Sequence, residues 1–256
     1  MKIRLIGSSV GGAGVGQCLS SYVVDDRVAI DAGALGFYGS VADQSAIRHV
    51  FLTHSHQDHV ASLPILLDNV YGSGVPPIIH AAAPVLASLQ SDLFNNRVWP
   101  DFIGLSKTLP PFLELRELTP GVPVELPDMD GLKVTALPVD HVVPCVAYLL
   151  ERPGCAAAIV TDTRPVDDLW QRLAAVPDLK LVFLECAFPD EEGALAKIAK
   201  HLTPSEFRAE RAKFPAHVQC VAMHVKPRFH AEVVAQLQAL CGPSIAIAEA
   251  NRVYCI

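Results

Sequence analysis

The chain has 256 residues, of which 51% are hydrophobic and 18% charged, and its formal net charge is −7. This length and apolar content allow the buried core of one or two domains. The negative charge disfavours binding to a large nucleic acid, which needs clustered Lys and Arg. Neither a signal-peptide segment nor a run of about 20 apolar residues is present, so we expect neither secretion nor a membrane span. The seven cysteines lie singly in the sequence, as is typical of reduced thiols in a cytoplasmic protein.

The first half of the chain is predicted to hold mostly strands. In chain order we expect strand 2–6, a glycine-rich loop 7–16, strands 21–24 and 27–30, helix 42–47, strand 49–53, helix 60–71, strand 78–81, helix 84–94 and an irregular proline-rich segment 100–127. The second half alternates strands and helices. In chain order we expect strands 132–138, 146–151 and 156–160, helix 166–175, strand 179–184, helices 194–200 and 205–214, strand 218–223, helix 229–240 and strand 244–248. No linker or repeat interrupts this pattern, which predicts a single α/β domain over residues 1–256.

A short segment after the predicted strand 49–53 concentrates residues that bind metals. It contains His54, His56, Asp58 and His59. Imidazole and carboxylate groups suit zinc, iron or manganese. Four such groups on one tight loop cannot easily all face one ion, but they can face two. A histidine-rich surface turn is the alternative, and the apolar strand that leads into the segment argues against it.

Three further candidate ligands follow later in the chain. His141 lies between two predicted strands, and Asp162 and His224 each follow a buried strand. Any one of them alone would more often be a polar residue at the end of a strand. The complete set, in this order, favours a site for two metals linked by a bridging carboxylate.

The pattern His-x-His-x-Asp-His, followed by His, Asp and His, resembles the metallo-β-lactamase superfamily. Several other stretches resemble its branch of class II cyclic-nucleotide phosphodiesterases and tRNA 3′-processing endonucleases. They are Ser20-Ser21-Tyr22, Asp31-Ala32-Gly33, Phe51-Leu52-Thr53-His54, Val139 to Pro144, Glu185-Cys186-Ala187-Phe188 and His224-Val225-Lys226-Pro227. The resemblance implies a four-layer αββα sandwich of two mixed β-sheets flanked by helices. One departure is Thr161, since the family usually has Gly before the bridging Asp.

The resemblance also implies a ligand set for two divalent ions, zinc first, with manganese or iron as alternatives. Metal one would take His54, His56 and His141, metal two would take Asp58, His59 and His224, and Asp162 would bridge them. In this family the two metals hold a hydroxide that attacks the substrate. Asp58 is therefore counted among the catalytic residues as well as the ligands.

A phosphodiester also needs its leaving oxygen protonated. By the resemblance, Glu185 and His201 occupy the positions of a catalytic Glu–His pair, although Leu184 replaces the usual His before the Glu. The alternative is that His201 is a helix-end residue near a helix dipole. Asp31 is a candidate to orient a ligand imidazole, or else a turn-forming residue.

The predicted function is hydrolysis of a 3′,5′-cyclic nucleotide or another small phosphodiester. A tRNA 3′-processing endonuclease is the first alternative, but residues 142–161 leave no space for the basic arm of that branch. Hydrolysis of a thioester or lactam is the second, and it gives no reason for the Glu185 and His201 pair. Sulfur oxidation at a single iron is a third. We expect no large nucleic acid and no membrane partner, and the sparse charge favours a homo-oligomer, a dimer.

Overall fold

The computed structural model describes residues 1–10, 16–242 and 245–256. They form two compact units. The first comprises residues 1–8, 19–119 and 253–255, and the second comprises residues 9–18, 120–252 and 256, in each case as far as they are described. Among the described residues, no helix has the length and apolar character needed to cross a membrane.

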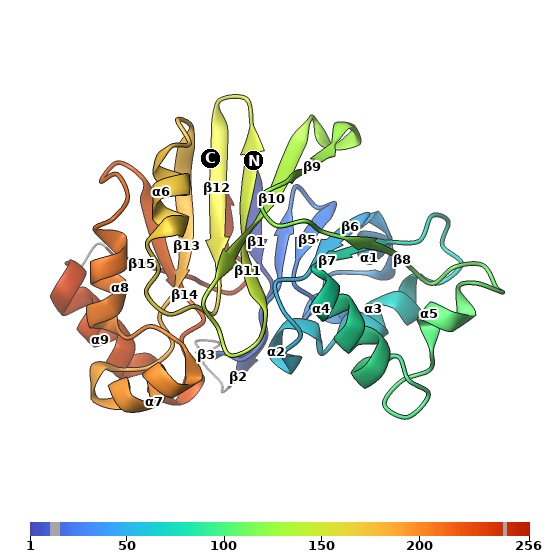
Figure 1. Ribbon diagram of the computed structural model, residues 1–256, viewed down its shortest axis with the longest axis horizontal. Helices are drawn as coiled ribbons and strands as arrows, with labels where there is room; N and C mark the ends of the chain where they lie inside the picture. Colours follow the sequence, from blue (N-terminus) through green and yellow to red (C-terminus); the bar gives the residue numbers. More distant parts are fainter. Residues whose placement is uncertain (11–15, 243–244) are drawn as a thin grey trace. The chain divides into compact units, whose positions relative to one another are not determined.

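The first unit is built on a mixed sheet of seven strands (Figure 1). Its strands, in spatial order, are β16 (Val253–Cys255), β1 (Lys2–Leu5), β4 (Tyr22–Val24), β5 (Val28–Ile30), β6 (His49–Phe51), β7 (Ile78–Ala81) and β8 (Glu114–Glu117). Strands β5 to β8 run parallel, and the other pairs are antiparallel. Its helices are η1 (Leu35–Phe37), α1 (Val41–Ala46), α2 (Gln57–Val60), α3 (Leu63–Val70), α4 (Ala83–Ser88), the π-helix η2 (Leu89–Leu93) and α5 (Phe102–Leu105).

Alternation along the strands explains how these helices attach. Val50 and Leu52 on one face of the sheet belong to a core cluster with Leu63 and Leu66 of α3. Successive strand residues point to opposite faces, so Phe51 lies on the other face, where it is also fully buried. Both faces of the sheet therefore exclude water, which explains the almost continuous apolar runs of these strands.

The second unit holds another mixed sheet of seven strands. They are β15 (Ala246–Ile247), β14 (Gln219–Met223), β13 (Leu179–Glu185), β12 (Cys155–Val160), β11 (Cys145–Arg152), β10 (Leu132–Val139) and β9 (Pro123–Leu126). Strands β12 to β15 are parallel, and β9 to β12 are antiparallel neighbours. The remaining elements are β2 (Ser9–Val10), β3 (Gly16–Gln17), η3 (Pro127–Met129), α6 (Asp168–Ala174), η4 (Asp190–Glu192), α7 (Gly193–Ala199), α8 (Pro204–Arg211), η5 (Pro227–Phe229) and α9 (His230–Cys241).

Helices α6, α8 and α9 cover one face of this second sheet (Figure 1). Trp170 of α6, Phe207 of α8 and Leu237 of α9 belong to one apolar cluster with Val182 and Ala222 of the sheet. This burial of large side chains is the main source of stability for such a layer.

The prediction of an irregular segment over residues 100–127 was wrong in part. It contains α5, β8 and β9, and η3 begins at its last residue. The two strands are the outermost strands of their sheets. Proline is tolerated at a sheet edge because the missing N–H faces away from the ladder, so Pro123 can begin β9. Strand β16 was missed because three residues give too short a pattern.

Two predicted helices also differ from the structure. The predicted helix 60–71 is two helices, α2 and α3, and Pro64 occupies the first turn of α3, where its missing N–H is harmless. The predicted helix 84–94 changes from α4 to the π-helix η2 at Leu89. Half of the predicted glycine loop, residues 11–15, lies outside the described residues, and the short strands β2 and β3 include three of the other residues.

Candidate metal centre

In the first unit, four candidate ligands lie on the loop after β6 and on the short helix α2. His54 and His59 are fully buried, and Asp58 retains some exposure. The rings of His54 and His56 have centroids 4.6 Å apart, and one donor atom of each lies within 4.8 Å of the other. The same limit holds for Asp58 and His59. The unit therefore presents two adjacent pairs of metal-binding groups.

Asp31 orients the rings of this group. Its carboxylate accepts hydrogen bonds from the Thr53 backbone N–H at 2.8 Å, the Thr53 hydroxyl at 2.9 Å and His59 Nδ1 at 2.6 Å. Thr53 Oγ1 also lies 3.0 Å from His54 Nδ1. Because Nδ1 of both imidazoles is engaged, Nε2 is the nitrogen left to bind a metal. Burial raises the pKa of Asp31 above its usual value, and the charge of His59 and the hydrogen bonds oppose that effect.

A glycine allows α2 to approach β5 closely. A Cβ atom at Gly33 would lie 2.1 Å from the carbonyl oxygen of Asp58. The neighbouring Ala32 N–H donates to the His59 carbonyl at 2.7 Å. The Asp-Ala-Gly stretch at residues 31–33 thus serves both the orientation of His59 and the position of the helix that carries it.

In the second unit, the candidate ligands follow the ends of three strands. His141 follows β10, Asp162 follows β12 and His224 follows β14. His141 Nε2 lies 3.7 Å from Asp162 Oδ2, and His224 Nε2 lies 3.2 Å from Asp162 Oδ1. Each oxygen of the carboxylate thus faces a different histidine, an arrangement that suits a carboxylate that bridges two metals. His141 Nδ1 donates to the Lys200 carbonyl at 3.2 Å, which again leaves Nε2 as the metal donor.

The chemistry of both donor sets fits divalent metals. Neutral imidazole and carboxylate are ligands for zinc, manganese and iron. Hydroxyl, carbonyl and carboxylate partners hold Nδ1 of His54, His59 and His141, as expected for histidines that bind a metal through Nε2.

Glu185 and His201 form a buried pair beside the ligands of the second unit. Glu185, at the end of β13, is fully buried and accepts from His201 Nδ1 at 2.9 Å and from the Thr163 backbone N–H at 2.7 Å. The ring of His201 lies 5.2 Å from that of His141 and 5.5 Å from that of His224, between centroids.

Burial and mutual charge shape the titration of this pair. Burial raises the pKa of Glu185, while the charge of His201 and the hydrogen bond oppose the rise. Burial alone would lower the pKa of His201, but the Glu185 charge and hydrogen bond outweigh it, so the pKa of His201 is raised. The imidazole therefore holds its proton more firmly than an ordinary histidine does.

Most of the chain matches the model of a known protein family. Residues 27–239 match the model of the β-lactamase superfamily domain, which is more than half of the chain and includes every candidate ligand. The chain belongs to the β-lactamase superfamily. The fold of this superfamily's metal-dependent members implies divalent metal ions, in agreement with the donor sets described above.

The chain is similar to two curated relatives with different names. A ribonuclease Z of Mycobacterium bovis is 30% identical over 166 residues, which cover 61% of this chain and 54% of the relative. A probable 3′,5′-cyclic-nucleotide phosphodiesterase of Yersinia pestis is 26% identical over 213 residues, 73% of this chain and 59% of the relative. The matched stretches thus span little more than half the length of these relatives.

Solved structures confirm the predicted fold class of two mixed sheets flanked by helices. Unliganded yeast PDE1 superimposes with a TM-score of 0.77 at 15% identity, over 98% of both chains. Zn²⁺-bound PqqB from Methylobacterium extorquens gives 0.73 at 17% identity, over 100% of both chains. At these identities the likeness shows the fold alone.

Three residues of this superfamily member were missed or left open by the sequence. Thr53 and Lys200 contact ligand histidines, yet their residue types carry no metal signal. Lys226 Nζ lies 2.9 Å from His224 Nε2, and Arg228 lies over the Phe229 ring at 5.3 Å from its centroid. Lys226, named from the sequence only within a stretch that resembles the family, therefore contacts a candidate ligand directly.

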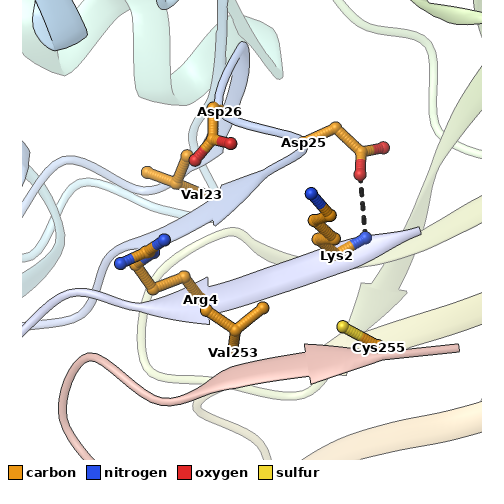
Figure 2. A pocket seen from close by; sticks show the side chains of 7 residues that line it. All are labelled: Lys2, Arg4, Val23, Asp25, Asp26, Val253 and Cys255. Carbon is orange, nitrogen blue, oxygen red and sulfur yellow. Dashed lines mark hydrogen bonds between the residues drawn. The ribbon is translucent and has the colours of Figure 1, made fainter.

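The first unit also has a hollow between its strands (Figure 2). Its volume is about 160 Å³ and its lining comes from β1, β4, the turn after β4, and β16. The Lys2 backbone N–H donates to Asp25 Oδ1 at 2.8 Å there. None of the candidate ligands lines this hollow, so it is not the metal centre.

Proposed function

We propose that this chain is a metal-dependent phosphodiesterase that hydrolyses a 3′,5′-cyclic nucleotide or another small phosphodiester. The seven candidate ligands of the two units would together hold two divalent ions, with zinc the first choice. One ion would be bound by His54, His56 and His141. The other would be bound by Asp58, His59 and His224. Asp162 would bind both ions. When bound, the ions supply Lewis-acid stabilisation of the charge that develops on a phosphoryl group.

The observation that carries this proposal is the Glu185–His201 pair beside two ligand rings. Glu185 engages Nδ1 of His201 and strengthens the hold on its proton. This leaves Nε2 to donate a proton to the leaving oxygen of a substrate. A poor alkoxide leaving group, as in a cyclic nucleotide, requires such a proton donor. A thioester has a good leaving group and gains far less from one.

The segment between His141 and Asp162 supports a small substrate. It folds as the antiparallel pair β11 and β12, joined by residues 153–154. Residues 142–161 thus contain no inserted arm of the kind that tRNA-processing members use to grip tRNA. The formal net charge of −7 also opposes the approach of a polyanion.

Ribonuclease Z activity is the second candidate, because the Mycobacterium bovis relative has that name. One panel of substrates separates the candidates. The zinc- and manganese-loaded protein would be assayed with cyclic AMP, cyclic GMP, 2′,3′-cyclic nucleotides, bis(p-nitrophenyl) phosphate, a precursor tRNA, a thioester and a lactam. The Asp162→Ala variant serves as the blank.

We expect turnover of at least one cyclic or small phosphodiester well above that of the blank. Cleavage of precursor tRNA alone would replace the proposal with the second candidate. Turnover of the thioester or lactam, with no turnover of any phosphodiester, would reject both the proposed phosphodiesterase activity and ribonuclease Z activity.

A further inference from the structure

Lys200 sits at the C-terminal end of α7 with an unusual backbone conformation. Its φ is +57°, in the left-handed region, where glycine is the default residue. A lysine in this backbone conformation has steric strain that a glycine would not have. The requirements of the helix cap therefore do not explain why this residue is lysine.

The side chain of Lys200 forms hydrogen bonds with the loop that carries His141. Nζ donates to Asp140 Oδ1 at 2.6 Å and to the carbonyl oxygen of His141 at 3.0 Å. In return, the Lys200 carbonyl accepts the hydrogen bond from His141 Nδ1 at 3.2 Å. One residue thus holds the main chain and the ring of a candidate ligand at the same time.

These contacts connect the ligand with the predicted proton donor. Lys200 directly precedes His201, whose ring packs edge-on against that of His141. The Asp140 carbonyl in turn accepts from the Arg164 N–H at 2.9 Å, two residues after Asp162. The loops of His141, Asp162 and His201 therefore meet at the Lys200–Asp140 pair.

We propose that Lys200 is a positioning residue of the metal centre. It orients the His141 ring so that Nε2 can bind the ion, and it fixes the backbone position of the adjacent His201. This inference rests on the proposed function. Lys200 acts through His141 and His201 and needs no contact with substrate. Loss of its side chain should therefore weaken metal binding and lower kcat while KM changes little.

The test compares zinc affinity, measured by competition with a chelator, across a set of variants. Lys200→Met and Lys200→Gly should bind zinc roughly 10–100-fold more weakly than the natural protein, the usual cost of losing a group that orients a ligand. Lys200→Arg should restore most of the affinity, since its guanidinium can reach both acceptors. Lys197→Met, an exposed position one turn earlier on α7, is the matched control and should change nothing.

Glycine separates positioning from a purely structural role. A residue needed only to cap α7 is replaced without loss by Gly at a positive φ, so wild-type affinity in Lys200→Gly would overturn the proposal. Asp140→Ala provides a second route if Lys200→Met folds poorly. It removes one of the two acceptors of Lys200 Nζ and should show part of the loss, and the double variant should be no worse than Lys200→Met alone, because Lys200→Met already removes the contact with Asp140.

The experiment distinguishes failure of the proposed function from failure of the positioning role of Lys200. If the natural protein binds no metal, the proposed function falls and this inference falls with it. If the natural protein binds metal and hydrolyses phosphodiesters, but every Lys200 variant matches it, only the positioning role is rejected.

Discussion

Three residues of the candidate centre share a strained backbone at the scale of the single residue. Asp31 and His224 directly follow the last residue of a strand and Asp162 comes one residue later, at φ of 60°, 58° and 33°, respectively. Left-handed backbone costs a non-glycine residue about 1–2 kcal/mol. Such strain persists where the surrounding structure requires it, and it clusters at functional sites. In each case the turn places a functional side chain at the end of its strand.

Replacement of the proposed bridging carboxylate should remove metal and activity together. Each oxygen of Asp162 faces a different candidate histidine ligand, so Asp162→Ala should lose both metals and reduce turnover to the rate without enzyme. Asp68→Ala, at an exposed position of α3, should keep both. Metal content by elemental analysis and turnover are measured on the same samples. Full activity in Asp162→Ala would show that the carboxylate bridges nothing.

Loss of the predicted proton donor should depend on the leaving group. His201→Ala should keep its metals but slow turnover of a substrate with an alkoxide leaving group by roughly 10²–10⁴-fold. The loss should be much smaller with a nitrophenolate leaving group, which needs little protonation. Equal losses on both substrates would indicate that His201 binds phosphate, and loss of metal would make it a ligand.

At the scale of elements, neighbouring strands and helices bury titratable groups that affect stability. In the first unit, His49 of β6 and His80 of β7 face each other, with Nδ1 of one 3.0 Å from Nε2 of the other. His80 also stacks on Phe51, with ring centroids 4.3 Å apart. Burial, with smaller effects of His49 and Arg116, lowers the pKa of His80 to about 3.

This histidine should make the protein sensitive to acid. Below pH 6.5, His80 binds a proton in the unfolded chain but stays neutral in the folded chain. The free energy of unfolding therefore falls as the pH drops toward 3. Between pH 6.5 and pH 4.5 the loss should be roughly 2–3 kcal/mol. Urea denaturation at both pH values should show a smaller loss in His80→Gln than in the natural protein. His217→Gln, at an exposed position, should match the natural protein, and a His80→Gln variant that did the same would contradict the assignment.

In the second unit, Glu210 joins α8 to α6. Its buried carboxylate accepts from the Trp170 indole, the Val166 N–H and Lys213 Nζ. Glu210→Ala should lower the free energy of unfolding by about 2–4 kcal/mol, because the Trp170 indole and the Val166 N–H lose their acceptor and Lys213 loses one of its acceptors. Metal content of the folded variant should not change. Glu232→Ala, exposed on α9, is the control for urea denaturation, and equal midpoints would refute the role of Glu210.

At the scale of the whole molecule, the ligands are divided between the two compact units. Four lie in the unit of β6 and three in the unit of β10, β12 and β14. If these sets hold two ions, metal binding should be linked to folding, since a ligand that binds only the folded chain stabilises it. The predicted dimer stays a prediction, and sedimentation at several protein concentrations would test it.

The number of metals per chain tests the complete ligand set. Elemental analysis of protein saturated with zinc and then desalted should give about two ions per chain. Zinc should also raise the melting temperature, and removal by a chelator should reverse the rise. A well-folded sample that never exceeds one ion would reject the dinuclear proposal, and one iron per chain would favour sulfur oxidation.

Much of this protein could be predicted from local pattern. The histidines and aspartates after buried strands, and the strands themselves, follow from periodicity and residue type, which are properties of short segments. Element boundaries were less certain. The edge strands β8 and β9 were hidden by their prolines, and β16 was too short to give a signal.

Only the tertiary structure decided which side chains support the ligands. Asp31 holds His59 from 28 residues away, Glu185 holds His201 from 16, and the Lys200 carbonyl holds His141 from 59. Such hydrogen bonds depend on which strands are neighbours and on the register between them, and no local pattern encodes either. Lysine and threonine are also common surface residues. The sequence therefore determined the candidate metal ligands, whereas strand order and loop geometry determined what orients them.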